Sequence, residues 1–330
     1  MRPIFLGICA AFFFAFTFVL NREMELSGGS WIWSASLRYV FMIPFLFFFF
    51  LVMTRKKFGS LLQEMRKQPG AWLLWSFVGF GLFYAPLCFA AAYGPGWLIA
   101  GTWQITIISG SLIVPLFYET IQTAKGTIKV RRRIPFKGLA MSIIILFGVA
   151  LMQFEHASQL SPKDVWLGVL PVIMASFAYP LGNRKVMEMC EGRLDAYQRV
   201  LGMTLASLPL WLILSFYGFF TVGLPSKGQI TQSILVAIFS GVIATVLFFR
   251  ATDMARGNMQ MLAAVEATQS MEVLFAVAGE LVVLASPFPS GLSWIGMLLV
   301  IIGMILHSYV SHIKKTISNS TTDNSSRAVL

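Results

Sequence analysis

Charged residues are scarce in this sequence of 330 residues. Asp, Glu, Lys and Arg make up 12% of it, while 57% of the residues are hydrophobic and the mean hydropathy is +0.75. A water-soluble protein of this length carries about a quarter charged residues. Most of the surface of this chain is therefore expected to face lipid.

The motifs of several enzyme classes are also missing. The sequence has no HExxH pair, no nucleophile elbow, no Asp-rich cluster and no Walker phosphate loop. Its three cysteines, Cys9, Cys88 and Cys190, are scattered singly without metal or disulfide spacing. We therefore expect neither an enzyme nor an ATPase subunit, and no metal or cofactor. A channel is disfavoured because no selectivity filter is visible.

What the sequence does contain is a series of long apolar segments. A helix needs roughly 20 mainly apolar residues to cross the hydrocarbon of a bilayer, and the segments lack the alternation of barrel strands. The pattern predicts an all-α integral membrane protein with ten transmembrane helices. They span about 3–20, 30–53, 71–93, 97–118, 135–153, 164–182, 197–217, 230–251, 259–285 and 292–310.

The net charge of +11 follows membrane topology. With a cytoplasmic N-terminus, 21 of the 25 Lys and Arg residues, including Arg184 and Arg199, fall on the cytoplasmic face, and Arg38 falls within the second helix. The opposite face receives only Arg22, Lys163 and Lys227. This asymmetry is what the positive-inside rule requires. We therefore expect a cell-membrane protein with both termini in the cytoplasm and no nucleic-acid partner.

The chain repeats itself at an offset near 161 residues. Arg38 corresponds to Arg199, and Glu119 corresponds to Glu280. Other pairs are LNREME (20–25) with LGNRKVME (181–188), WQIT (103–106) with VEAT (265–268), and FGVALM (147–152) with IGMILH (302–307). These weak matches, which occur in the same order in both parts, indicate a duplicated unit.

An odd number of helices in each unit turns the second copy upside down in the membrane. The expected units are 1–157 and 158–315, followed by a polar, disordered tail at 316–330. Inverted halves with a substrate site between them near the midplane are typical of secondary transporters. The fold expected is an inverted five-plus-five repeat with both termini on the cytoplasmic side.

These features resemble the drug/metabolite transporter superfamily. Two apolar runs end in Glu, LIVPLFYE (112–119) and LFAVAGE (274–280), and the stretch LAAVEATQSMEVLFAVAGE (262–280) is most similar to the branch of multidrug resistance efflux transporters. The resemblance covers about residues 3–310 and implies drug export. The ninth helix lacks the central Pro common in sister branches, which weakens any transfer of sugar, nucleotide-sugar or amino-acid specificity.

The ninth segment carries the strongest candidates for a binding site, because ionisable groups in a membrane helix need a compensating use. On a helical wheel Glu266, Gln269 and Ser270 share one side, and Glu272 lies about 120° away. The repeat partner of Glu266 is Gln104, flanked by Trp103 and Thr106. We expect the fourth and ninth helices to bring these groups together between the halves.

Glu266 is the predicted centre of the site. A low-dielectric surrounding favours the neutral form of a carboxyl, which suits a proton carrier. When ionised, Glu266 would attract a cation whose apolar body rests on Trp103, Tyr84 or Tyr179. The structural alternative is that a basic residue such as Arg250 or Arg256 holds Glu266.

Five further residues are candidates for gating or coupling. Glu272 either takes part in coupling or pairs with Arg38 for packing. Glu119 and Glu280 are expected at helix ends, where they either act as gates or anchor the helices. Arg38 and Arg199 either close gates against carboxylates or extend to lipid headgroups.

The sequence thus predicts a secondary transporter that exports small lipophilic or cationic compounds by alternating access, coupled to protons. Its partners would be the substrate, protons and membrane lipids, and it would act as a monomer or homodimer. One alternative is an exporter or facilitator of amino acids or other metabolites. A structural or chaperone membrane protein is the alternative outside transport, and it leaves the inverted repeat and the buried carboxylates unexplained.

Overall fold

The computed structural model describes residues 2–53, 58–93, 96–123, 126–157, 161–283, 288–307 and 309. Within them, eight helices are long and apolar enough to cross a membrane. Two shorter apolar helices, Leu98–Leu112 and Gly291–His307, lie at the positions of the expected fourth and tenth spans. The chain is a multi-pass membrane protein, and the expected tail at 316–330 lies outside the described residues.

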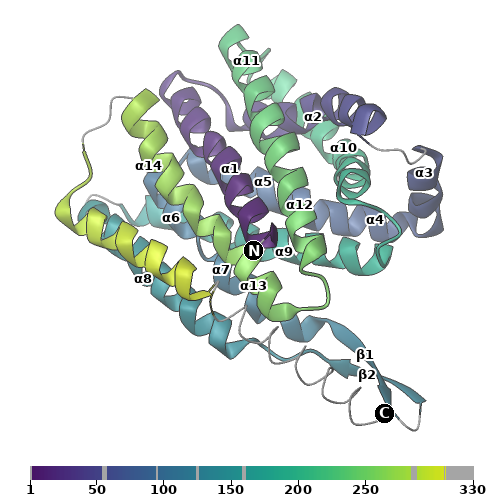
Figure 1. Cartoon of the computed structure of the whole chain (residues 1–330). Coiled ribbons are helices and arrows are strands. Elements are labelled where there is room, and N and C mark those ends of the chain that lie inside the picture. Colours follow the sequence, from purple (N-terminus) through teal and green to yellow (C-terminus); the bar gives the residue numbers. More distant parts are fainter. Residues whose placement is uncertain are drawn as a thin grey trace.

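The described residues of the first part of the chain form a series of helices, with a two-stranded hairpin before the last of them (Figure 1). Its elements are α1 (Arg2–Leu26), α2 (Trp31–Met53), α3 (Phe58–Lys67), α4 (Pro69–Ser76), the π-helix η1 (Phe77–Gly81), α5 (Leu82–Ala91), α6 (Gly96–Trp103), α7 (Thr106–Leu112), the 3₁₀ turn η2 (Val114–Leu116) and α8 (Phe136–Ala157).

The second part is likewise built of helices. Its elements are α9 (Pro162–Cys190), α10 (Ala196–Thr221), α11 (Lys227–Val236), the π-helix η3 (Ala237–Ala244), α12 (Thr245–Met254), α13 (Met259–Ala267), the 3₁₀ turn η4 (Thr268–Ser270), α14 (Met271–Val283) and the helix Gly291–His307. Polar residues start several of these helices: Asp195 forms a capping box with Gln198 at α10, and Asn258 caps α13.

A two-stranded antiparallel hairpin interrupts the helical order between α7 and α8. Strands β1 (Tyr118–Thr123) and β2 (Gly126–Arg131) pair with Tyr118 opposite Arg131, and they project from the helical body (Figure 1). The sequence analysis predicted no strand here and placed Glu119 at a helix end; its backbone instead lies in β1. The reason is local, because Phe117 turns extended after η2 and both strands contain β-branched residues.

The two parts of the chain are intertwined, because the first helix of each packs against helices of the other. Helix α1 lies against η3, α12 and α14 of the second part, and α9 lies against α4, η1, α5, α6 and α7 of the first. Helices α2 and α10 pack directly on each other. Each part therefore contributes its first helix to the other part.

Irregular helical turns occur at matching places in the two parts. The π-helix η1 interrupts the span Pro69–Ala91, and η3 interrupts the span Lys227–Met254 about 160 residues later. Between α6 and α7, the backbone N–H groups of Gln104 and Ile105 donate to the carbonyls three residues earlier, as in a 3₁₀ turn. The 3₁₀ turn η4 likewise separates α13 from α14. The fourth and ninth segments are therefore both discontinuous near their middle.

Two glycines set the approach of α9 to η1. A methyl group added at Gly182 would overlap the Cα and N atoms of Gly79, and one added at Gly79 would lie 3.1 Å from the Gly182 Cα atom. The two backbones can pack this closely only because neither residue has a side chain.

The variant Gly182→Ala is therefore expected to be destabilised by about 1–3 kcal/mol through overpacking. The measurement is the midpoint temperature of thermal unfolding in detergent, with circular dichroism as the probe of helix content. Gly59→Ala is the matched control, because Gly59 lies in α3 with no atom within 4 Å of the added methyl group. Equal midpoints for the two variants would show that the crossing tolerates a side chain.

Candidate functional site

A small cavity lies where the breaks of the fourth and ninth segments meet. It has about 20 Å³ of open space, room for roughly one or two water molecules. Irregular backbone at membrane depth is tolerated where protein covers it or where it lines a cavity. The lining residues are Phe14, Thr17, Phe18, Arg38, Phe83, Tyr84, Leu87, Trp103, Tyr179, Ser240, Gln269 and Glu272.

Glu272 is the carboxylate of this cavity. It stands in the first turn of α14, directly after the 3₁₀ break, and its side chain is 1% exposed. The Nε1 atom of Trp103, the last residue of α6, donates to Glu272 Oε2 at 3.2 Å. Glu272 Oε1 is buried and accepts no hydrogen bond. One hydrogen bond thus joins the two broken segments and leaves half of the carboxylate open to another donor.

Arg38 brings a positive charge from α2 to the same cavity. Its Nη2 atom donates to Ser240 Oγ at 3.0 Å, and Ser240 also accepts from Thr17 at 2.6 Å. The guanidinium carbon lies 4.0 Å from the centroid of the Tyr84 ring, a cation–π geometry. Arg38 is 2% exposed, so the hypothesis that it extends to a headgroup is wrong. It belongs to the interior.

Aromatic rings form the apolar wall of the cavity. The Phe83 centroid lies 4.6 Å from that of Tyr179 and 5.1 Å from that of Trp103. The hydroxyl of Tyr179 is buried and has no hydrogen-bond partner. Tyr84, Trp103 and Tyr179, which the sequence analysis proposed as platforms for a substrate, therefore meet on one surface.

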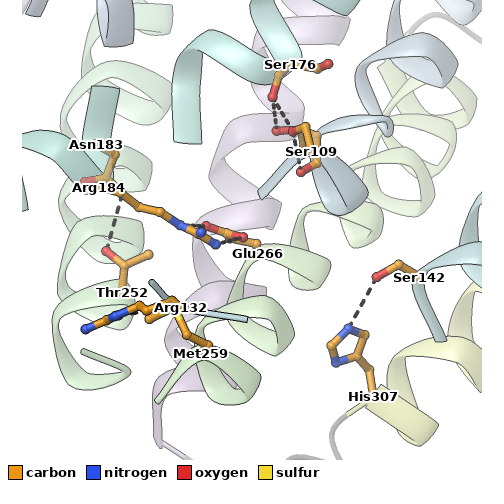
Figure 2. Close-up of polar contacts among 11 residues, drawn as sticks. Ser109, Arg132, Ser142, Ser176, Asn183, Arg184, Thr252, Met259, Glu266 and His307 are labelled. Carbon is orange, nitrogen blue, oxygen red and sulfur yellow. Dashed lines mark hydrogen bonds and ion pairs between the residues drawn. The ribbon is translucent and has the colours of Figure 1, made fainter. Parts of the chain in front are cut away.

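Glu266 has a different environment. It is buried in α13 and forms a bidentate ion pair with Arg184 of α9, at 2.9 Å to Nε and 2.6 Å to Nη2 (Figure 2). Gly110 of α7 leaves room for the carboxylate, because a methyl group there would overlap Glu266 Oε2. Glu266 is not among the residues that line the cavity.

The identity of this partner differs from the expectation. Arg250 and Arg256 were the suggested basic residues, whereas Arg184 had been counted among the loop charges of the cytoplasmic face. Helix α9 extends to Cys190, so Arg184 lies inside it and is 3% exposed. Arg199, expected at the cytoplasmic start of the seventh helix, is buried in α10 and pairs with Asp253 Oδ1 at 2.8 Å.

The other predicted site residues divide between cavity and packing. Gln269 lines the cavity, and its Nε2 atom has no partner. Gln104 and Ser270 bond to backbone carbonyls of their own segments, and Thr106 donates to the carbonyl of Ser176. Figure 2 shows Ser109 reaching the same carbonyl, so this group joins α7 to α9.

The last two predicted site residues, Glu119 and Glu280, are placed by the secondary structure of their backbone. Glu119 lies in β1, and Glu280 lies in α14. Among the residues that the structure describes, no three His, Cys, Asp or Glu side chains gather as a metal site would require.

A second pocket lies next to the cavity, beyond Tyr84. It is lined by Asn21, Met24, Gly29, Ser30, Trp31, Ser34, Cys88, Ala91 and Ala92, from the end of α1, the start of α2 and the end of α5. The Nδ2 atom of Asn21 donates to the Tyr84 hydroxyl at 3.5 Å, so a weak hydrogen bond joins a residue of this pocket to a residue of the cavity wall.

Sequence reasoning missed half of the lining. Phe14, Thr17, Phe18, Phe83, Leu87 and Ser240 come from α1, α5 and η3. The hydroxyls of Thr17 and Ser240, each set in an apolar run, were a usable signal. The phenylalanines carried none, because the chain has 30 of them.

Comparison with known proteins agrees with this picture of a membrane transporter. A family model described as "EmrE: Putative multidrug resistance efflux transporter" matches residues 1–313. The chain is 59% identical over 315 residues to "Uncharacterized protein YjlA" of Bacillus subtilis (strain 168), covering 96% of this chain and 97% of the relative. It is 50% identical over 272 residues to "Uncharacterized 42.1 kDa protein in intracellular alkaline protease 3'region" of Shouchella clausii, covering 82% and 70%.

The fold is also found among solved structures. One described as "Crystal structure of protein" superposes with a TM-score of 0.70 at 13% identity and covers 94% of this chain and 100% of its own. That likeness concerns the fold alone. The match over residues 1–313 shows that the chain belongs to the EmrE-like family of multidrug resistance efflux transporters.

Proposed function

We propose that this protein is a secondary transporter of the cell membrane that exports small organic molecules by alternating access. The observation that carries the proposal is the cavity at the two helix breaks, where the carboxylate of Glu272 faces aromatic rings. Discontinuous helices around a central cavity are the usual construction of a substrate site in secondary transporters. Lipophilic and cationic compounds suit a carboxylate surrounded by rings.

An inverted repeat of units 1–157 and 158–315 supports alternating access. The paired π-helices, the paired breaks and the reciprocal packing of α1 and α9 are what a two-fold relation between the units predicts. Two like halves can exchange conformations, which turns a cavity open on one side into a cavity open on the other.

The orientation follows from the positive charges. With both termini in the cytoplasm, α13 enters the membrane from the cytoplasmic face. Glu266 then lies nearer the cytoplasm than Glu272. Six residues of helix correspond to about 9 Å. The ion pairs Arg184–Glu266 and Arg199–Asp253 would then close the cytoplasmic side, while the weak Asn21–Tyr84 bond joins the outer pocket to the cavity wall.

Glu272 is the residue we propose as the proton carrier. Glu266, the candidate from sequence, has both carboxylate oxygens bonded to the Arg184 guanidinium in this conformation. Glu272 has a single neutral donor and a free oxygen next to open space. A proton and a cationic substrate competing for Glu272 would give antiport.

The variant Glu272→Gln is expected to lose proton-driven uptake of a cationic dye into inverted membrane vesicles, because an amide cannot exchange a proton with the cavity. Uptake is measured with and without an imposed pH gradient. Glu188→Gln is the matched control, since Glu188 is an exposed partner of Lys185. Gradient-driven uptake that persists in Glu272→Gln would rule out Glu272 as the carrier.

Glu266→Gln tests the structural part of the proposal separately. Removing one partner of a buried ion pair costs about 3–5 kcal/mol, because the other charge stays buried and uncompensated. We expect a lower thermal midpoint for Glu266→Gln and partial recovery in the double variant Arg184→Gln/Glu266→Gln. The double variant Lys185→Gln/Glu188→Gln, which removes a surface ion pair, is the comparison. We expect its thermal midpoint to change little. A Glu266→Gln midpoint equal to that of the unaltered chain would contradict the assignment.

A further inference from the structure

The buried charged side chains among the described residues fall into two groups. Arg184 is matched by Glu266, and Arg199 is matched by Asp253. Arg38 and Glu272, which are 2% and 1% exposed, form no ion pair with any described residue. Removing a charge from water without a partner is expensive, so these two groups need an explanation.

Arg38 is compensated only in part. It has the hydroxyl of Ser240 and the face of Tyr84 as neighbours, and its Nε atom has no hydrogen-bond partner. The repeat offset that relates Arg38 to Arg199 sets Ala92 against Asp253, so the first unit lacks the carboxylate that neutralises the second arginine. A strong anion site is therefore left open in the first unit.

Glu272 is the complementary case. Its Oε2 atom accepts from the Trp103 indole, and its Oε1 atom has no donor. Glu272 and Arg38 line the same cavity without contacting each other as an ion pair. Two opposite charges that face one space from separate walls can both be satisfied by a single ligand of matching polarity.

The remaining lining is consistent with such a ligand. The Tyr179 hydroxyl and the Gln269 Nε2 atom are buried, unpartnered and next to the cavity. Phe14, Phe83 and Leu87 provide an apolar surface for a side chain. The cavity has only about 20 Å³ of open space, so the surrounding helices must separate for such a ligand to enter.

We propose that the ligand is zwitterionic: a small compound with an ammonium group for Glu272, an acidic group for Arg38 and a compact apolar body. This inference rests on the proposed function and refines its substrate class. A ligand with only a positive charge can still bind Glu272 but leaves Arg38 unmatched, so it is expected to bind more weakly than a zwitterion. A ligand with only a negative charge would meet the same difficulty at Glu272.

Four probes with one common body test the charge pattern on the unaltered full chain. They are leucine, leucinamide, N-acetylleucine and N-acetylleucinamide, which carry both charges, the positive charge alone, the negative charge alone and neither. Binding to the purified protein in detergent is measured by isothermal titration calorimetry. We expect leucine to bind at least about tenfold more tightly than each of the other three, because each blocked group leaves a buried charge unpaired.

Two variants assign the charges to residues. Arg38→Gln should bind leucinamide at least as tightly as leucine, and Glu272→Gln should bind N-acetylleucine at least as tightly as leucine. Arg66→Gln, on the exposed surface of α3, should keep the order of the unaltered chain. The comparison of the four probes on the unaltered chain remains decisive if either variant fails to fold.

The possible failures are distinguishable. If leucinamide binds as tightly as leucine, or if none of the four probes binds, the zwitterion inference is overturned. Proton-driven dye uptake that depends on Glu272 would in that case leave the proposed function standing. If dye uptake is also independent of Glu272, the proposed function fails with it.

Discussion

The structure depends on one constraint: in the interior of a membrane protein, where bulk water is excluded, every charge and every backbone polar group needs a partner. The ion pair of Arg184 with Glu266 meets this requirement between α9 and α13, and that of Arg199 with Asp253 meets it between α10 and α12. Both pairs join helices that are distant in sequence. The same requirement makes Arg38 and Glu272 conspicuous, because they are equally buried and lack an ionic partner.

The constraint also explains where the helices break. The turns at Gln104 and at η4 interrupt the regular backbone bonding of two segments, and they occur where the chain is fully covered by protein. At these turns the side chains of Trp103 and Glu272 meet. The breaks in the two helices and the cavity therefore have one structural cause: the fourth and ninth segments are discontinuous where they meet.

The sequence predicted the helical segments well and the site less well, for a physical reason. Hydropathy depends on residue type and window length. Eight of the ten expected windows coincide with helices long enough to cross a membrane, and the other two coincide with shorter apolar helices. A helical wheel, in contrast, assumes continuous α-geometry. The 3₁₀ turn between Glu266 and Glu272 changes their relative direction, and the wheel could not include it. The choice of Arg184 as partner depends on packing between α9 and α13, which no local pattern encodes.

The packing of α1 and α9 suggests why the buried ion pairs matter for motion. Helix α9 lies within the first part of the chain, so its bond to Glu266 of α13 ties that part to the second. Separating a buried pair is costly unless water or another charge replaces the lost partner. Opening toward the cytoplasm must therefore be coupled to hydration of Arg184 and Glu266. A ligand that satisfies Arg38 and Glu272 can help to drive this change only if it binds the opened arrangement more tightly than the closed one.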